Sequence, residues 1–152
     1  MSALVLKTQL AIKDAIVALG LTWPATIRAE CSRGPMDEDN DANPASNELP
    51  AILVEASNAQ EIHTESPTAF VDVSIKVQHQ ADESNVSETV EPQVRELGEW
   101  IMGDDFLGNV SSAATSYTAL GRRAVSINFA RVGRRFEHAF NFQLLATPGG
   151  VN

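Results

Sequence analysis

Carboxylate side chains recur at alternate positions in one polar stretch of the chain, with the spacing of a calcium-binding loop. Positions one, three, five and twelve of that pattern are held by Asp37, Asp39, Asp41 and Glu48. The sixth position, where such a loop needs glycine for its sharp turn, is Ala42, and Pro44 stands at the eighth. We therefore expect an exposed acidic loop over 32–50 and keep calcium binding by these carboxylates as the alternative.

The histidines and the single cysteine are the other side chains that could act in catalysis or metal binding. These residues are Cys31, His63, His79 and His138. They are far apart in the sequence, and no two histidines have the short spacing typical of metal ligands. His138 alternates with phenylalanines in a strand pattern, so we expect a structural histidine, and we expect Cys31 to be a small buried hydrophobic residue. The sequence contains neither a glycine-rich phosphate loop nor a serine nucleophile elbow, so we predict that the protein is not an enzyme and needs no cofactor.

The charge is acidic overall but basic toward the C-terminus. A formal net charge of −9 disfavours nucleic-acid binding, since phosphate contacts depend on Lys and Arg. Two pairs of arginines bracket a predicted hairpin: Arg122, Arg123, Arg134 and Arg135. They either solvate the strand ends or reach carboxylates of an adjacent copy of the chain, where a guanidinium group can pair bidentately. The second alternative predicts a subunit interface formed by these four residues.

Two segments have the apolar periodicity of an amphipathic helix. The stripe of the first consists of Val5, Ile12, Ile16 and Leu19. Gly20 is expected to end this helix. The stripe of the second consists of Val90, Val94, Leu97, Trp100 and Ile101. Gly103 is expected to end the second helix, and the following stretch, 106–120, has no pattern that favours one structure.

Alternation of apolar and polar residues predicts the strands that these helices cover. The clearest alternation lies over 70–80, where one face is apolar and the other polar. Its apolar residues are Val71, Val73, Ile75 and Val77. A strand over 51–56 precedes it, and a first strand over 23–30 contains Pro24, which indicates the edge of a sheet.

The last third of the chain predicts a hairpin with arms at 125–129 and 136–144, a turn at 132–134 and a loose tail over 146–152. The order of the elements implies one α+β domain over 1–152, with a mostly antiparallel β-sheet and two helices packed on one face. No apolar run reaches the roughly 20 residues that a membrane helix requires, and no signal-peptide cleavage pattern follows the first helix. We therefore expect a soluble protein that is made in the cytoplasm and binds no membrane.

With this order of elements the chain resembles the tail-terminator or tail-completion (neck) proteins of long-tailed bacteriophages. Four segments carry the resemblance, in pattern and order: LKTQLAIKDAIVAL, PTAFVDVSIKVQHQ, VEPQVRELGEWIM and AVSINFARVGRRFEHAFNFQLL. Together they cover most of the chain. The acidic loop has no counterpart in the resemblance.

The resemblance implies a structural virion protein made in the host cytoplasm. Such subunits form a homo-oligomeric ring, usually a hexamer, that caps the tail tube and joins it to the head-side connector. DNA passes through the ring without sequence-specific binding, and an acidic lumen would repel it. A neck or head-completion connector of the same particle is the alternative role. A calcium- or small-ligand-binding α+β module is the alternative of another class.

Overall fold

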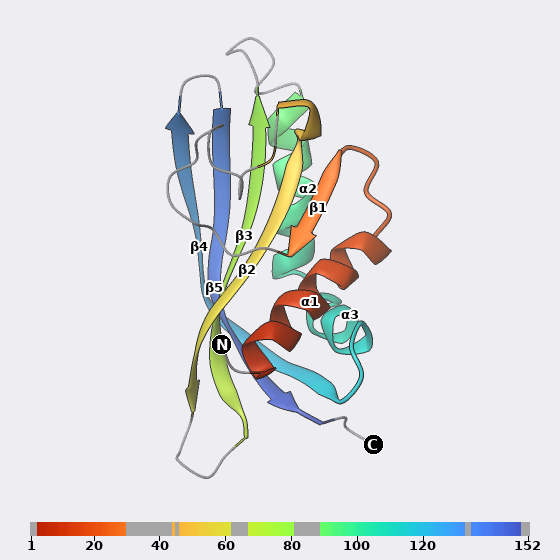
Figure 1. Ribbon diagram of the computed structural model, residues 1–152, viewed down its shortest axis with the longest axis vertical. Coiled ribbons are helices and arrows are strands. Elements are labelled where there is room, and N and C mark those ends of the chain that lie inside the picture. Colours follow the sequence, from red (N-terminus) through yellow and green to blue (C-terminus); the bar gives the residue numbers. More distant parts are fainter. Residues whose placement is uncertain are drawn as a thin grey trace.

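The computed structural model describes residues 3–29, 44, 46–61, 67–80, 89–132 and 135–149 (Figure 1). Its elements, in chain order, are α1 (Ala3–Ala18), β1 (Thr26–Ala29), the 3₁₀ turn η1 (Ser46–Glu48), β2 (Ala51–Glu61), β3 (Ala69–Gln80), α2 (Glu91–Met102), α3 (Phe106–Ser112), β4 (Tyr117–Val132) and β5 (Arg135–Pro148). The α+β class and the mostly antiparallel sheet are confirmed.

The strands form one five-stranded sheet in the order β1-β2-β3-β5-β4. All neighbouring strands run antiparallel except β1 and β2, which are parallel. The edge position predicted for the first strand is confirmed, and Pro24 lies just before it, where no backbone N–H is needed for the ladder. The hairpin is also confirmed, but both of its arms are longer than predicted.

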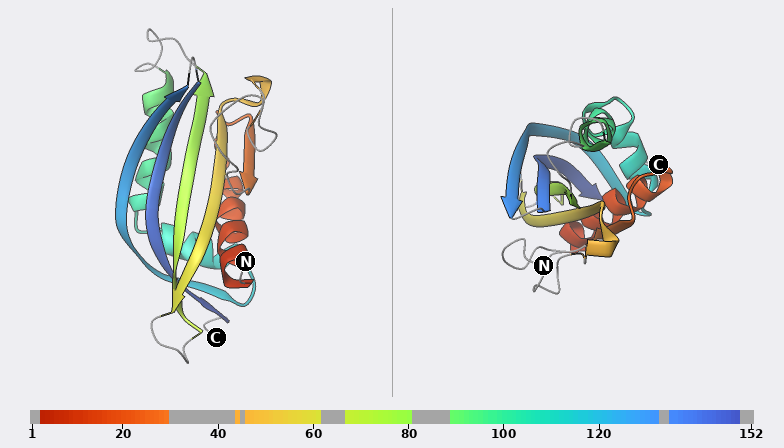
Figure 2. Two further views of the ribbon diagram at one scale, coloured as in Figure 1. Left: turned by 60° about the vertical axis from the view of Figure 1, so that its left-hand side comes forward. Right: turned by 90° about the horizontal axis from the view of Figure 1, so that it is seen from above.

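The centre of the sheet is built by β3 and β5, and over most of their length both alternate between a buried, mainly apolar face and a mainly polar face. Val73 is paired with Phe142 and Ile75 with Phe140, and these four buried side chains point toward the helices. Gln78, Arg135 and Ala139 are also buried but have the opposite parity. Figure 2 shows the helices gathered on this one side of the curved sheet. The core residues from the two strands are Val71, Val73, Ile75, Val77, Phe140, Phe142 and Leu144.

Three helices cover the buried face, one more than predicted. The additional helix, α3, lies in the stretch 106–120 and buries Phe106 and Val110. Its seven residues are too few to produce a recognisable period. Helix α2, which precedes α3, ends at Gly103, as predicted. The Gly103 N–H donates to the Trp100 carbonyl oxygen.

Buried polar groups between α1 and the sheet satisfy one another. The Tyr117 hydroxyl donates to Thr8 Oγ1 at 3.0 Å, and Thr8 in turn donates to the Leu4 carbonyl at 2.8 Å. Burial raises the pKa of Tyr117 to about 12. The Ala56 N–H donates to Gln9 Oε1 at 2.9 Å. These bonds fix the register of α1 on the sheet without leaving a buried polar group unpaired.

Both the second strand and the fourth strand contain β-bulges. The bulge in β2 lies between Ser57 and Ala59, with Asn58 at a φ of 46°. One bulge in β4 lies between Arg123 and Ser126, with Ala124 at a φ of 59°. Because bulges increase the local twist, the two flanking strands bend at the same level on either side of β3 and β5.

Two sequence expectations about irregular segments need correction. The loose tail predicted from Ala146 is wrong for residues 146–148, because Ala146 is fully buried and pairs with both Ala69 and Ala119. Most of the predicted 32–50 loop lies outside the described residues. Within its described part, Pro44 is buried and Ser46–Glu48 form η1, so this part is not a simple exposed loop.

A matched pair of glycine substitutions tests how α2 sits on the sheet. A Cβ added at Gly98 would lie 3.0 Å from Phe140 Cε1, whereas a Cβ at Gly108 would meet no atom within 4 Å. Gly98→Leu is expected to lower the free energy of unfolding by about 1–3 kcal/mol, because the core is overpacked. Gly108→Leu is the control and is expected to be neutral or slightly stabilising. Urea denaturation measures both, and equal effects would contradict this packing.

Candidate functional site

Arg122, the first of the predicted interface arginines, holds the C-terminus of α2. Its Nη2 donates to the carbonyl oxygens of Met102 at 2.8 Å and Gly103 at 2.9 Å. Its guanidinium carbon also lies 5.5 Å from the centre of the Phe106 ring. A cation at this position satisfies helix-terminal carbonyls and interacts favourably with the helix dipole. Arg122 therefore joins β4 to the C-terminal end of α2.

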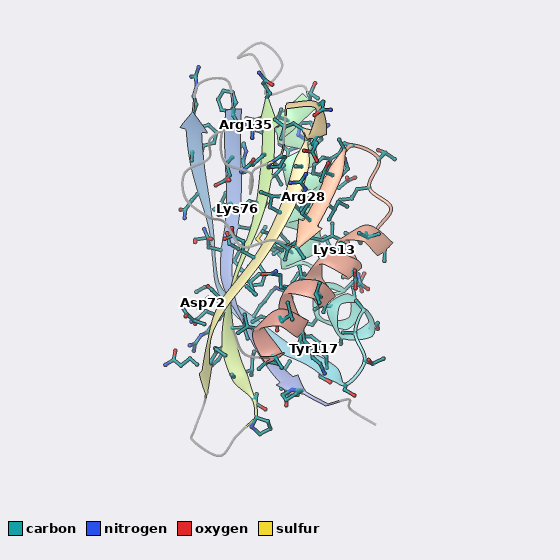
Figure 3. The ribbon with its side chains drawn as sticks, in the orientation of Figure 1. Lys13, Arg28, Asp72, Lys76, Tyr117 and Arg135 are labelled. Carbon is teal, nitrogen blue, oxygen red and sulfur yellow. The ribbon has the colours of Figure 1, made fainter. Side chains whose placement is uncertain are left out.

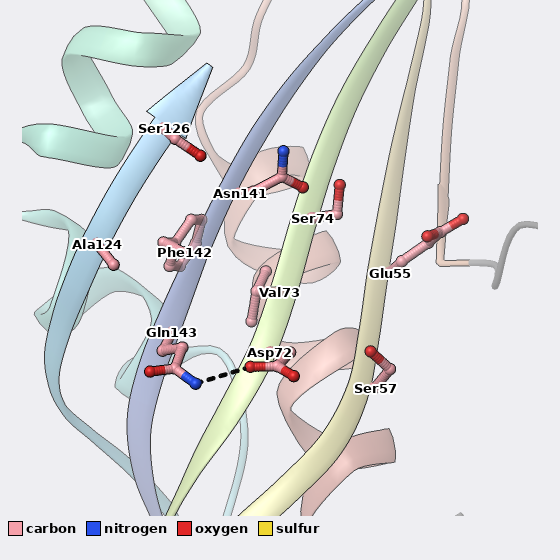
Figure 4. Close-up of a pocket in the computed structure, with 10 residues that line it drawn as sticks. All are labelled: Glu55, Ser57, Asp72, Val73, Ser74, Ala124, Ser126, Asn141, Phe142 and Gln143. Atoms are coloured by element: carbon pink, nitrogen blue, oxygen red, sulfur yellow. Dashed lines mark hydrogen bonds between the residues drawn. The ribbon is translucent and has the colours of Figure 1, made fainter. Parts of the chain in front are cut away.

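Arg123 points to the opposite face of the sheet, because neighbouring strand residues alternate. Its Nε donates to Gln143 Oε1 at 2.8 Å, and its guanidinium carbon lies 3.6 Å from the centre of the Phe70 ring. Gln143 Nε2 donates in turn to Asp72 Oδ1 at 2.9 Å (Figure 4). Three strands are thus linked by one polar chain from Arg123 to Asp72.

The second predicted pair lies at the far end of the hairpin. Arg134 is outside the described residues. Arg135 is only 4% exposed and its Nη1 donates to the Pro44 carbonyl at 2.7 Å. Figure 3 places Arg135 at the upper end of the sheet, far from Tyr117 at the start of β4. The structure therefore does not bring Arg135 close to Arg122 and Arg123, and the role of the four arginines in a subunit interface stays a prediction.

A shallow groove of about 310 Å³ runs across the polar face of the sheet, between the bulged strands (Figure 4). Its lining includes Glu55, Ser57, Asp72, Ser74, Ser126, Asn141 and Gln143. Lys76 Nζ lies 3.3 Å from the Glu55 carboxylate, and Gln143 donates to Asp72. Both carboxylates of the groove are therefore engaged by neighbouring strands, whereas the buried Ser74 Oγ has no hydrogen-bond partner.

The structure brings together two histidines that are distant in the sequence. His79 Nε2 lies 3.3 Å from His138 Nδ1, and the two rings stack with centroids 5.3 Å apart. His79 also stacks on Phe136, and Phe129 meets the His138 ring edge to face at 5.1 Å. The pair lies on the helix side of the sheet, where β3, β5 and β4 meet.

Both imidazoles resist protonation. Burial, followed by the charge of a protonated His138, lowers the pKa of His79 from 6.5 to about 4. Burial also lowers the pKa of His138, and the Glu91 carboxylate partly opposes this shift. Neutral rings fit the position, since only one N–H can lie between the two facing nitrogens.

The calcium alternative falls mostly on residues outside the described ones. Asp37, Asp39 and Asp41 lie outside them, as do Cys31 and His63. Glu48 is described and forms an ion pair with Arg28 of β1. Among the described residues no group of three or more histidine, cysteine or carboxylate side chains could hold a metal ion.

Among the described residues, large apolar side chains are exposed on β4 and α1 and at Met102, the last residue of α2. On β4 they are Leu120, Ile127 and Phe129, and on α1 they are Leu6, Leu10 and Val17. Ile127 is 56% exposed and Phe129 is 58% exposed, although both have the parity of the buried face. The helices do not reach this part of the edge strand, so the sheet extends beyond its own cover (Figure 1).

Sequence reasoning missed the histidine pair and the exposed edge. Strand parity could have found the pair, because His79 continues the apolar alternation of β3 and His138 that of β5. Parity alone places both histidines on the same face of the sheet. That they are close to each other depends on β3 and β5 being neighbours, which no sequence pattern indicated.

Within the described ranges no helix is both long and apolar enough to cross a membrane. No family model matches the chain, and no curated protein matches its sequence.

Removal of the Arg122 guanidinium tests its role at the end of α2. Arg122→Met is expected to lower the free energy of unfolding by about 1 kcal/mol, because two carbonyl oxygens lose a charged donor. Arg95→Met, at an exposed position in α2, is the matched control and should change stability by less than about 0.5 kcal/mol. Chemical denaturation monitored by tryptophan fluorescence provides the measurement. A similar small effect of both substitutions would show that Arg122 does not hold the helix.

The histidine pair, in which His79 is buried and His138 half-buried, predicts a loss of stability in mild acid. Because the pKa of His79 is lower in the folded chain than in the unfolded chain, the unfolded chain binds more protons between pH 6.5 and 4. The free energy of unfolding is therefore highest above pH 6.5 and falls as the pH falls. At pH 5 the contribution of His79 to this decrease is about 2 kcal/mol. His79→Phe, which retains a ring to stack on Phe136, should lose less stability than the wild type between pH 7.5 and pH 5. Parallel losses in urea titrations would contradict the prediction.

Proposed function

We propose that this protein is a ring-forming structural subunit of a bacteriophage tail, a tail terminator that caps the tail tube and joins it to the head-side connector. The observation that carries the proposal is the long edge strand β4, which displays Ile127 and Phe129 to solvent. A further support is the order of elements, which agrees with that expected from the resemblance.

The long, partly apolar edge strand β4 is a candidate surface for contact with another protein. β4 has 16 residues, and the described part of the sheet pairs it with β5 on one side only. Soluble monomers usually keep their sheet edges short, charged or covered, and exposed apolar patches commonly mark interaction sites. The adjacent exposed side chains of Ile127 and Phe129 form such a patch at the end of the strand.

A ring requires a contact between two different surfaces of neighbouring copies, and the two edges of the sheet differ in length. β1 has four residues and β4 has 16. Contacts between unlike surfaces repeat from subunit to subunit, and they close into a ring when the rotation between subunits allows it. The acidic net charge of −9 suits a ring through which DNA passes without being held.

The position along the head-to-tail axis separates the proposal from its alternative. A tail terminator binds the end of a tail tube, whereas a neck or head-completion protein binds the connector on the head side. The same ring geometry serves both roles, and pull-down with purified tube protein and purified connector distinguishes them.

Self-association tests the proposed function directly. The purified protein is expected to change from monomer to a single closed oligomer as its concentration rises, because a heterologous contact stops growing only when the ring closes. Light scattering coupled to size-exclusion chromatography measures the mass, and negative-stain electron microscopy shows the shape. A monomer at every concentration, both alone and with tube protein, would overturn the proposed function.

A further inference from the structure

We propose that the exposed end of β4 in one copy of the chain docks in a groove between α1 and α3 of the next copy. Phe129 is the side chain that enters the groove, and Arg131 pairs with Asp14 at its rim. This inference rests on the proposed ring and specifies the contact between its subunits.

The receiving groove lies between the C-terminal half of α1 and α3 and has a volume of about 280 Å³. Its apolar lining comes from Ala15, Ala18, Leu19 and Ala113. Asp14, Asn109 and Ser112 form a polar rim. Pockets for small-molecule ligands usually measure about 300–1,000 Å³, so this groove is slightly smaller than that range. Its small apolar floor suits one aromatic side chain from a protein partner.

The outer surface of α1 supports an interface beside this groove. Its exposed large side chains are Leu6, Leu10 and Val17, which share one side of the helix at helical spacing. The opposite side is buried and includes Ile12 and Ile16. Exposed apolar side chains that gather on one side of a surface helix commonly mark a contact surface. This side of α1 is therefore a candidate surface for contact with another molecule.

The inserting surface is the face of β4 that extends beyond the helices. Ile127, Phe129 and Arg131 alternate along the strand and point to the same side. Phe129 packs one side of its ring against Phe136 and His138 but remains 58% exposed. Aromatic side chains that are held in place at an edge make effective anchors, because little rotamer entropy is lost when they dock.

Charge complementarity selects the second copy as the partner. Arg131 is exposed two residues beyond Phe129, and Asp14 is exposed at the groove rim. Asp14 Oδ1 lies 3.6 Å from Lys13 Nζ, and an ion pair of this length on the surface is weak. A guanidinium that arrives with Phe129 can bind this carboxylate bidentately. One strand face thus supplies both the apolar and the cationic group that the groove and its rim accept.

The two surfaces lie well apart on the molecule. In Figure 1 the end of β4 is at the upper left, and the helices α1 and α3 meet at the lower right. The second orientation in Figure 2 agrees with this separation along the long axis. Figure 3 also places Lys13, next to Asp14, on the side away from β4. One subunit therefore cannot satisfy its own groove, and each copy offers one insert and one groove to two different neighbours.

Mixing of two blocked variants tests this contact. Phe129→Asp removes the insert and leaves the groove, whereas Ala18→Arg fills the groove and leaves the insert. Each variant alone is expected to remain monomeric, while an equimolar mixture forms a heterodimer and no larger species. Native mass spectrometry resolves these masses. Met102→Asp, at a position that is 53% exposed outside the contact, is the control and should assemble like the wild type.

The outcomes separate the contact from the ring. Rings formed by Phe129→Asp, or the absence of heterodimer in the mixture, would overturn the contact and leave the proposed ring standing. A wild type that stays monomeric under all conditions would overturn both. Circular dichroism melts establish that each variant is folded, and Phe129→Ser is the second variant if the aspartate unfolds the edge strand.

A charge exchange examines the Arg131–Asp14 pair independently. Asp14→Arg is expected to raise the protein concentration needed for assembly about tenfold or more, because two cations then face each other. Arg131→Asp in the same chain should restore the wild-type concentration. A double variant no better than Asp14→Arg would contradict the pair.

Discussion

The one-sided burial of the central strands is the constraint on which the rest of this structure depends. β3 and β5 each place a continuous row of branched and aromatic side chains on one face, and this face must be removed from water. In the described part of the chain, the helices α1, α2 and α3 pack on this face and shield it from water. The helices do not cover the C-terminal end of β4, and there the apolar side chains of Ile127 and Phe129, which have the same parity, remain exposed. The candidate interface is thus the part of the apolar sheet face that the helices leave exposed to solvent.

The alternation in 70–80 and in the hairpin was sufficient to predict the class of fold and its dominant pairing, because a period of two is specific to strands. The edge position of the first strand also followed from Pro24. The sequence did not reveal α3, whose seven residues fall below the length at which a helical period can be read. It also did not reveal that β5 continues to Pro148, since Ala146 is buried by contacts with residues from β3 and β4.

The candidate site was less predictable than the fold, for a physical reason. Residue type identified the arginines, but their partners are set by register: Arg122 meets carbonyl oxygens of α2, and Arg123 meets Gln143. The proximity of His79 to His138 depends in the same way on β3 and β5 being neighbours although β4 separates them in the chain. Parity along one strand can be read from a sequence, whereas contact across strands requires the strand order.

The short parallel strand at the other border of the sheet has a consequence of its own. β1 offers only four residues of backbone and is entered from a proline, so it is a poor template for strand addition. Copies that meet through their backbones can therefore join only at the β4 border, and two copies joined there leave no long border open. The inequality of the two borders limits uncontrolled growth into cross-β aggregates, even in a protein whose long border exposes Ile127 and Phe129.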